Sequence, residues 1–356
     1  MKRLDFKGTP REIGLQHGRL LKPEILRQLK FYEGLFIKKS KLTWPQVLEI
    51  ARDFEPTLKR ETSELYEEMA AIAEGLNEPE IGVLDIIALN CRSEIALGKW
   101  SDGCTAVGMK LGNPPKEFLA QNWDWNKEMK ENIAVVSIES LGKPKIWMVT
   151  EAGIIGKIGF NSSSVGVCLN AIRARPMNPT LPPIHILLRL VLESTSLADA
   201  ISKLQSLGGC ATSAHMLIAD STGSRGVEIS PNGICILNED ANGIVAHSNH
   251  FILNRLVDEP KWLEDSPFRI ERMKTIAGSL LREHTTTPSK NPIKQVRDLF
   301  RDRENAPGAI CRSEASELGI ASLFNIVMEL DKSNPKAEVV FAIGSEEEKP
   351  VMHMPW

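Results

Sequence analysis

The sequence feature that most constrains the fold is a change in hydrophobic patterning at Gly103 and Cys104. Before this point, between positions 9 and 90, apolar residues recur at helical spacing, as in the stripe from Val47 to Phe54. After it, short apolar or alternating runs are separated by turns that contain Gly, Pro and Asn, which is typical of antiparallel strands. We therefore predict a helical segment followed by a sheet-rich segment.

The helical segment carries clear start signals. Thr9-Pro10-Arg11-Glu12 and Thr43-Trp44-Pro45-Gln46 each place a capping residue before Pro and an acid or amide three residues after the cap. Gly14 and Gly18 lie four residues apart on one face of the first helix. Two glycines at this spacing predict close packing against a neighbouring helix.

The order of elements predicts the fold class. The runs predicted as strands are 105–110, 118–121, 133–138, 146–150, 164–170, 215–219, 226–230, 234–237 and 244–248. Helices are predicted at 183–193, from Ser196 to the glycine pair at 208–209, and over a polar region at 268–303 that contains a loop at 285–291. A hairpin of 322–330 and 337–343 closes the chain. This order favours an α+β fold in which two antiparallel sheets lie between helical layers.

Composition excludes several classes of protein. The chain has 356 residues and a net charge of −3 with dispersed Lys and Arg, so we expect no nucleic-acid partner. No apolar run reaches membrane length and the first residues do not form a secretory signal, so we expect a cytoplasmic protein with no membrane association. The cysteines are widely spaced without a Cys-x-x-Cys pair, which argues against a disulfide framework or a zinc site. They are Cys91, Cys104, Cys168, Cys210, Cys235 and Cys311.

Cys104 is the leading candidate for chemistry. It follows Gly103, whose carbonyl is open to attack and whose backbone can adopt strained angles, and it precedes a predicted strand. This layout fits a thiol that attacks the peptide bond before it. The cut would leave Cys104 as a new N-terminus that carries a nucleophile and an amine on one residue. The alternative is an ordinary buried cysteine.

Polar residues at the ends of predicted strands form the remaining candidates. Asp124, between two tryptophans, could orient an amine or a thiol near Cys104, or could instead form an Asx-type turn. Asn249 could donate its amide to an oxyanion. His247 and His250 could act as a base, and without a third ligand they are a weak metal signal, so no metal is predicted.

Two further residues complete the set of candidates. Arg312 follows a Pro-Gly turn, where it could bind a carboxylate or pair with Asp124. Ser230 places a hydroxyl at the end of a predicted strand. For each of the two, a satisfied surface or loop position is an equally good interpretation.

Together these motifs resemble the acyl-coenzyme A:isopenicillin-N acyltransferase family of N-terminal nucleophile hydrolases. The stretches that carry the resemblance are Pro10–Gly14 with His17-Gly18, Glu68–Gly75, Asn90–Glu94, Asp102–Thr105, Gln121–Trp125 and Ser248–His250. It implies a four-layer αββα sandwich that cuts itself between Gly103 and Cys104. Residues 1–103 would become an α-subunit and residues 104–356 a catalytic β-subunit.

The resemblance also implies roles for single residues. Cys104 would be the nucleophile, Asp124 would lie near its freed amine, and Asn249 would stabilise the oxyanion. Four residues would serve maturation or substrate positioning, namely Gly103, Thr105, Ser230 and Arg312. The family can carry a serine just before this arginine, where this chain has Cys311. The C-terminus also lacks the peroxisomal address of penicillin-making fungal members, which argues against penicillin synthesis.

The predicted activity is hydrolysis or transfer at linear amide bonds through an S-acyl-Cys104 intermediate. Substrates would be small N-acyl compounds or short peptides. No cofactor is predicted, although acyl-coenzyme A could serve as co-substrate. Two alternatives remain, a cysteine hydrolase that uses His247 or His250 as base and an uncut relative that only binds its ligand or a partner. The sequence leaves the oligomeric state open.

Overall fold

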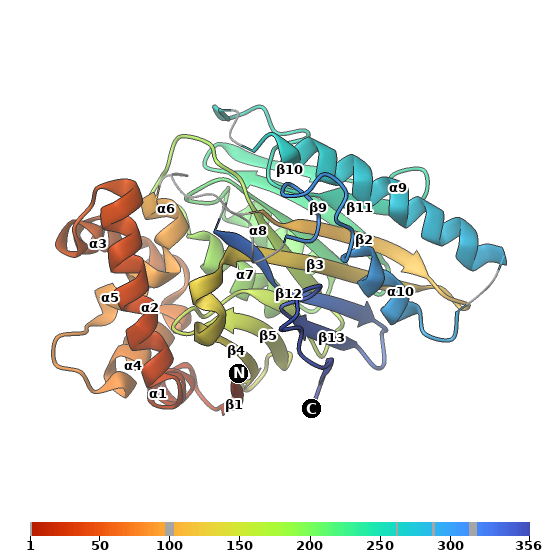
Figure 1. The fold of residues 1–356 in the computed structure, drawn as a ribbon. Coiled ribbons are helices and arrows are strands. Elements are labelled where there is room, and N and C mark those ends of the chain that lie inside the picture. Colours follow the sequence, from red (N-terminus) through yellow and green to blue (C-terminus); the bar gives the residue numbers. More distant parts are fainter. Residues whose placement is uncertain (1, 97–102, 261–262, 287–288, 313–318) are drawn as a thin grey trace.

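The structure is a computed structural model that describes residues 2–96, 103–260, 263–286, 289–312 and 319–356 (Figure 1). Gly103 and Cys104 lie within these ranges. Ser101 and Asp102 of the predicted processing motif lie outside the described residues, as do Thr287 and Pro288 of the predicted loop.

In the described ranges the strands form two sheets. Sheet A has the order β1-β4-β5-β6-β7-β8-β9-β10, and sheet B has the order β11-β2-β3-β12-β13-β14. Sheet A consists of β1 (Lys2–Lys7), β4 (Ile133–Glu139), β5 (Ile146–Glu151), β6 (Ile158–Asn161), β7 (Gly166–Ala171), β8 (Ala214–Asp220), β9 (Gly223–Ser230) and β10 (Gly233–Leu237). Sheet B consists of β2 (Thr105–Leu111), β3 (Lys116–Asn126), β11 (Ile244–His247), β12 (Ile320–Leu330), β13 (Lys336–Phe341) and β14 (Met352–Met354). Neighbouring strands are antiparallel except β1, which runs parallel to β4.

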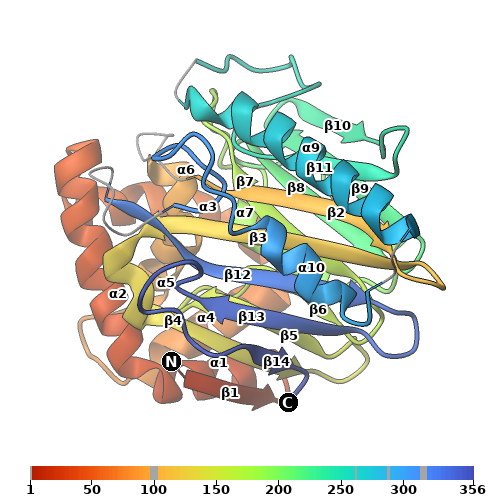
Figure 2. The same cartoon turned by 45° about the vertical axis from the view of Figure 1, so that its right-hand side comes forward.

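Helices cover the outer faces of both sheets (Figures 1 and 2). The N-terminal group comprises α1 (Pro10–Leu20), α2 (Lys22–Leu35), η1 (Phe36–Ser40), α3 (Trp44–Glu61), α4 (Ser63–Leu76), α5 (Val83–Asn90) and α6 (Arg92–Ala96). The later helices are η2 (Lys127–Asn132), α7 (Ile184–Leu192), α8 (Leu197–Ser206), α9 (Asp265–Thr286) and α10 (Pro292–Leu299). α7 and α8 contact sheet A, while α9 and α10 contact sheet B. The predicted α+β sandwich of two sheets between helices is confirmed.

Residues of β2 and β3 alternate between two apolar layers, as expected for strands buried on both faces. Ala106 and Trp123 belong to the large core that extends between the sheets. Val107 and Phe118 belong to a second cluster under α9 and α10. This alternation decides which side chains of β2 and β3 face sheet A.

The main differences from the sequence prediction lie in polar strands. β1 was not predicted because Lys2–Lys7 is rich in charge and buries only Phe6 fully. β6 was also missed. β3 extends beyond the predicted run to Asn126, because polar side chains such as Gln121 and Asp124 are buried within it. Helix α9 begins before residue 268 and continues to Thr286, inside the range predicted as a loop.

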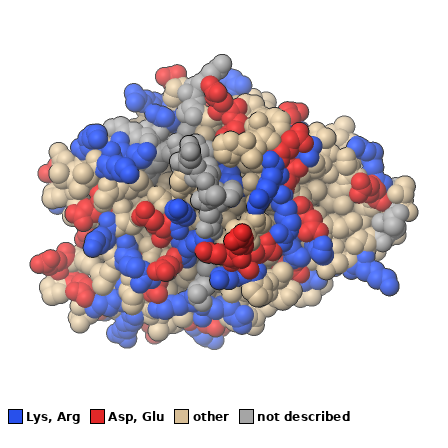
Figure 3. All heavy atoms as spheres, in the orientation of Figure 1, with Lys and Arg blue, Asp and Glu red and all other residues tan. Residues whose placement is uncertain are grey.

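On the face shown in Figure 3, basic and acidic side chains are interspersed. Within the described ranges, no helix combines the length and apolar character that crossing a bilayer requires.

The predicted close packing of the first helix is confirmed. Thr9 caps α1 through a capping box with Glu12. A Cβ atom added to Gly14 or Gly18 would overlap backbone carbonyl oxygens of α4, and one added to Gly75 would lie 2.6 Å from the Leu15 oxygen. The two helices therefore meet backbone to backbone, a contact that only glycine permits here.

This contact predicts unequal effects of two Gly→Ala substitutions. Gly14→Ala should lower the free energy of unfolding by about 1–3 kcal/mol, because the added methyl group overpacks the α1–α4 interface. Gly34→Ala on α2 is the matched control, since a Cβ there meets no atom within 4 Å. It should be neutral or stabilise by up to about 1 kcal/mol. Urea denaturation of both variants tests this, and equal effects would contradict it.

Candidate active site

Cys104 lies immediately before β2 and between two neighbouring strands. In the register of β2 with β3, Thr105 is opposite Asn122, so Cys104 is next to Trp123. The side chain of Cys104 is 1% exposed and belongs to the core between the sheets. The thiol thus faces sheet A rather than the helices α9 and α10.

Asn249 follows β11, the strand that pairs with the other edge of β2. His247, the last residue of β11, is opposite Ala106, and continuing this register places Asn249 beside Cys104. The Asn249 Oδ1 accepts the backbone N–H of Cys104 at 2.9 Å, and its Nδ2 donates to the Ala171 carbonyl at 3.0 Å. Asn249 therefore contacts the nitrogen that a cut after Gly103 would turn into an α-amine.

The carbonyl of Cys104 is held from two directions. Asn170 on β7 donates its Nδ2 to this oxygen at 3.1 Å, and Arg269 on α9 donates an Nη1 hydrogen at 2.6 Å. Both groups of the Cys104 peptide unit thus have fixed partners, which orients the residue at the start of the strand.

Asp124 and Arg312 come together on the far side of sheet B. The Arg312 Nε lies 3.2 Å from the Asp124 Oδ2, and the Ser322 hydroxyl donates to the Asp124 Oδ1 at 2.6 Å. Arg312 also donates Nη2 hydrogens to both Asp265 oxygens, at 3.0 and 2.9 Å. The pairing of Arg312 with Asp124 that the sequence allowed is present.

A side chain at position 103 would displace Arg312. A Cβ atom on Gly103 would lie 2.6 Å from the Arg312 Nε. The guanidinium packs directly against the peptide bond that precedes Cys104.

The residues that contact predicted site residues but were not themselves predicted from the sequence include Asn170, Asp265, Arg269 and Ser322, and Arg269 makes the most contacts. It is fully buried and bonds to the Cys104 carbonyl, to the Thr105 hydroxyl at 3.0 Å, to the Asn249 Oδ1 at 2.9 Å and to Asp265 at 3.0 Å. One guanidinium thus joins three of the predicted site residues. In the sequence it is one of several arginines in a polar helical region, and nothing distinguishes it.

The positive charges of Arg269 and Arg312 are matched by the two carboxylates of Asp265 and Asp124. Burial lowers the pKa of Arg269, and the neighbouring Arg312 lowers it further, while Asp265 and Asp124 act in the opposite direction. Two arginines and two aspartates therefore share this side of the site, and Asp265 bridges the two guanidinium groups.

Ser230 lies in a different group of contacts. Its hydroxyl donates to the Gly233 carbonyl at 3.1 Å and accepts from the Asn232 N–H at 3.3 Å and the Asn254 Nδ2 at 3.4 Å. These bonds close the turn between β9 and β10. The contacts of the described residues do not connect Ser230 with Cys104.

The His247 ring is buried and makes polar contacts through both of its nitrogens. Its Nε2 lies 3.0 Å from the Glu228 Oε1, its Nδ1 lies 2.8 Å from the Ser248 carbonyl, and its ring stacks on His215 with 3.5 Å between centroids. Both ring nitrogens are thus engaged. The Nδ1 of His250 lies 2.7 Å from the Ser266 hydroxyl, and burial lowers the pKa of His250 to about 4.

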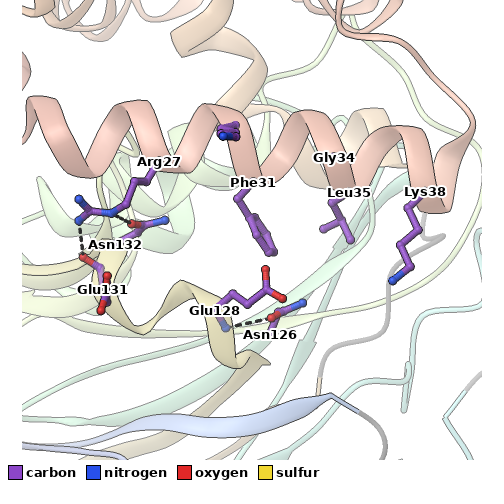
Figure 4. Close-up of a pocket in the computed structure, with 10 residues that line it drawn as sticks. Arg27, Phe31, Gly34, Leu35, Lys38, Asn126, Glu128, Glu131 and Asn132 are labelled. Carbon is purple, nitrogen blue, oxygen red and sulfur yellow. Dashed lines mark hydrogen bonds between the residues drawn. The ribbon is translucent and has the colours of Figure 1, made fainter.

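Among the described residues, neither a metal-binding cluster nor the pocket beside α2 coincides with this site. In the part of the chain that the structure describes, no three His, Cys, Asp or Glu side chains are grouped to hold a metal ion. A pocket of about 470 Å³ lies between α2 and η2, where Phe31 and Leu35 point toward Asn126 and Glu128 (Figure 4). Its lining does not include Cys104.

Comparison with known proteins identifies the family. A family model described as acyl-coenzyme A:6-aminopenicillanic acid acyl-transferase matches residues 112–341. The chain belongs to this family. A relative from Emericella nidulans, named acyl-coenzyme A:6-aminopenicillanic-acid-acyltransferase 40 kDa form, is 38% identical over 335 residues, which are 92% of this chain and 90% of the relative. The predicted family resemblance is confirmed, and the chain is an enzyme of acyl transfer or amide hydrolysis.

Solved structures give a more distant likeness. A mutant of conjugated bile acid hydrolase from Clostridium perfringens aligns with a TM-score of 0.48 at 11% identity, covering 70% of this chain and 92% of that one. Penicillin V acylase from Agrobacterium tumefaciens aligns with a TM-score of 0.47 at 14% identity, covering 70% and 85%. An N-acylethanolamine-hydrolyzing acid amidase ortholog from Caenorhabditis elegans has a TM-score of 0.44 at 14% identity, covering 71% and 100%.

The position of Arg269 leads to a test. Arg269→Lys keeps the charge, but an ammonium on a flexible stem cannot reproduce the planar fork that reaches four acceptors. We expect kcat to fall at least about tenfold, which corresponds to about 1.4 kcal/mol of transition-state stabilisation. Arg282→Lys, an exposed change on the same helix, is the control and should leave kcat unchanged. Equal activity of both variants would show that Arg269 does not position the site.

Proposed function

We propose that this enzyme acts through Cys104 as an acyl-accepting nucleophile and that it creates its own active form by cutting the bond between Gly103 and Cys104. The observation that carries the proposal is the convergence of Asn249, Arg269 and Arg312 on the two residues of this bond. The family adds support, because its activity is acyl transfer.

The self-cutting step balances with water as the only co-reactant. The Cys104 Sγ bonds to the Gly103 carbonyl carbon, the C–N bond breaks, and the Cys104 nitrogen takes up a proton. Water then attacks the thioester, which releases the Gly103 carboxylate and restores the thiol. Arg312 packs against Gly103, where its positive charge suits the developing oxyanion.

Turnover would use the amine that the cut creates. An α-amine has an unperturbed pKa of about 8, so near neutral pH a fraction can accept the thiol proton. The Asn249 Oδ1 already accepts the hydrogen on this nitrogen and would hold the amine in place. We assign Asp124 to fixing Arg312, and Thr105 to fixing Arg269, so that both guanidinium groups remain oriented.

The two proposed subunits, residues 1–103 and 104–356, would remain together after the cut. Glu68 on α4 and Arg189 on α7 form a buried ion pair with oxygen–nitrogen distances of 2.8 and 3.0 Å. β1 also lies in sheet A beside β4. Separating the two parts would expose the buried ion pair and break the strand pairing, which is costly.

The family supports a proposal for the substrate class. The relative's name specifies an acyl-coenzyme A donor and an amine acceptor, so we propose that this chain also takes its acyl group from a thioester or from a linear amide of a small N-acyl compound or short peptide. Water or an amine would then remove the acyl group from Cys104. Acyl-coenzyme A would be a co-substrate.

The alternative with His247 as base has less support. Both nitrogens of its ring are engaged by Glu228 and by the Ser248 carbonyl. A base in this position would have to leave these buried partners before it could accept a proton from Cys104. The uncut binding protein is also less well supported, since the chain belongs to a family of enzymes.

Cys104→Ala tests the proposal. The variant should remain a single uncut chain and should lose all turnover, because both reactions need the Sγ. Cys235→Ala is the matched control, a partly exposed cysteine outside the site, and should be cut and active like the wild type. Intact mass spectrometry and an amide-hydrolysis assay give the readouts. An active wild-type chain that stays uncut would overturn self-processing.

A further inference from the structure

A buried group of charges lies on the sheet A side of the nucleophile, and the mechanism above does not use it. Its centre is Glu151 at the end of β5. This carboxylate accepts hydrogen bonds from the Tyr32 hydroxyl at 2.7 Å, the Gln28 amide at 3.1 Å, Arg92 at 2.5 Å and the Lys157 Nζ at 2.7 Å. Tyr32, Gln28 and Arg92 come from residues 1–103, so both proposed subunits contribute.

The group holds more positive than negative charge. Arg92 and Lys157 face a single ionised carboxylate, because Arg92 and Lys157 hold the pKa of Glu151 well below its usual range even though burial acts to raise it. Burial raises the pKa of Glu94, another acid that interacts with Arg92, to about 7, so near neutral pH Glu94 is only partly charged. An excess buried charge is costly unless a counter-charge lies nearby.

Lys157 is the member of this group that contacts Trp123, the cross-strand neighbour of Cys104. Its side chain is 1% exposed, and its Nζ lies 4.1 Å from the centroid of the Trp123 ring. Trp123 is the register neighbour of Cys104, and both side chains belong to the core between the sheets. The ammonium, just before β6 of sheet A, and Cys104, just before β2 of sheet B, are therefore both neighbours of the same tryptophan.

The titration of Lys157 agrees with this geometry. Burial lowers the pKa of Lys157 to about 8, against the opposing effects of Glu151 and of Cys104. The titratable and charged groups that face Lys157 are Glu151 on β5, Arg92 on α6 and His185 on α7. Those that face Cys104 are Cys168 on β7, Arg269 on α9 and Arg312. A thiolate on Cys104 is thus electrostatically coupled to the lysine ammonium.

We propose that Lys157 is a positioning residue whose ammonium stabilises the thiolate of Cys104 in the uncut chain. This inference rests on the proposed self-cutting, and it answers a question that the proposed function leaves open. The α-amine cannot activate Cys104 for the first reaction, because that amine exists only after the cut. A neighbouring cation favours the thiolate, which is the nucleophilic form of cysteine.

Three substitutions separate this electrostatic role from a structural one. Lys157→Met removes the charge but keeps much of the apolar stem, and Glu151 retains its bonds to Tyr32, Gln28 and Arg92, so the core keeps a paired carboxylate. Lys157→Arg keeps the charge. Lys143→Met is the matched control, since Lys143 is a partly buried lysine that pairs with Glu64 and Glu193.

The first measurement is the rate of cutting. Each full-length chain is synthesised in a cell-free system near neutral pH, and the cut fraction is followed over time by intact mass spectrometry. We expect Lys157→Met to cut at least about tenfold more slowly than the wild type, which is the effect of a one-unit pKa change. Lys157→Arg and Lys143→Met should cut at close to the wild-type rate. Lys157→Met cut at the wild-type rate would overturn the proposal.

The second measurement is the pH dependence of Cys104 alkylation by iodoacetamide in freshly synthesised, folded chains. Only the uncut species is scored, as the alkylated peptide that spans Gly103 and Cys104 in peptide mass spectrometry. The reaction should reach its midpoint at higher pH in Lys157→Met than in the wild type. The difference should narrow above about pH 8, where Lys157 itself loses its proton. A structural role alone would slow Lys157→Arg as well and leave the midpoint unchanged, which would also overturn the proposal. If the wild type stays uncut, self-processing fails, and the alkylation midpoint alone decides the role of Lys157.

Discussion

The site depends on one buried guanidinium, that of Arg269. It connects helix α9 with the first residues of β2 and with the loop after β11, through the Cys104 carbonyl, the Thr105 hydroxyl and the Asn249 amide oxygen. A planar fork can hold several oxygen acceptors in fixed directions at once. Without it, the peptide unit of Cys104 would keep Asn170 and Asn249 as partners but would lose its connection to the helix.

Cys104 lies between two groups of charged side chains, one with equal numbers of positive and negative charges and one with an excess of positive charge. Its backbone faces the set of Arg269, Arg312, Asp265 and Asp124, in which two positive charges meet two negative ones. Its side chain faces the space between the sheets, where the group around Glu151 carries excess positive charge. The balanced set of arginines and aspartates can hold the backbone of Cys104 in place. The positively charged group around Glu151 can stabilise a thiolate. The alternation of β2 is the reason that one residue can face both.

Helices and strands with regular apolar spacing could be predicted from the sequence, because the periodicity reports which face is buried. The capping box at Thr9 and the close packing at Gly14 were predicted correctly for this reason. β1 and the end of β3 could not be predicted, since their charged or buried polar residues look like loop. Such residues become strand only through partners that are distant in the sequence.

Candidate site residues could be predicted from the sequence only where they lie in a recognisable local motif. Cys104, Asp124, Asn249 and Arg312 were predicted from local patterns and the family resemblance. In the structure Asn249 and Arg312 lie against the peptide bond before Cys104, and Asp124 pairs with Arg312. Arg269 and Lys157 carry no local signal. Arg269 binds the carbonyl of Cys104, 165 residues earlier in the chain, and Lys157 contacts Trp123, which belongs to the other sheet. Only the folded structure brings these partners together.

The most direct test is to trap the acyl group on the enzyme. The wild type is mixed with an N-acyl substrate, quenched in acid within the first turnover, digested, and mapped by peptide mass spectrometry. If Cys104 is the nucleophile, the acyl mass appears as a thioester on a peptide whose first residue is Cys104. An acyl group on another residue, or active enzyme that yields only peptides spanning Gly103 and Cys104, would contradict the mechanism.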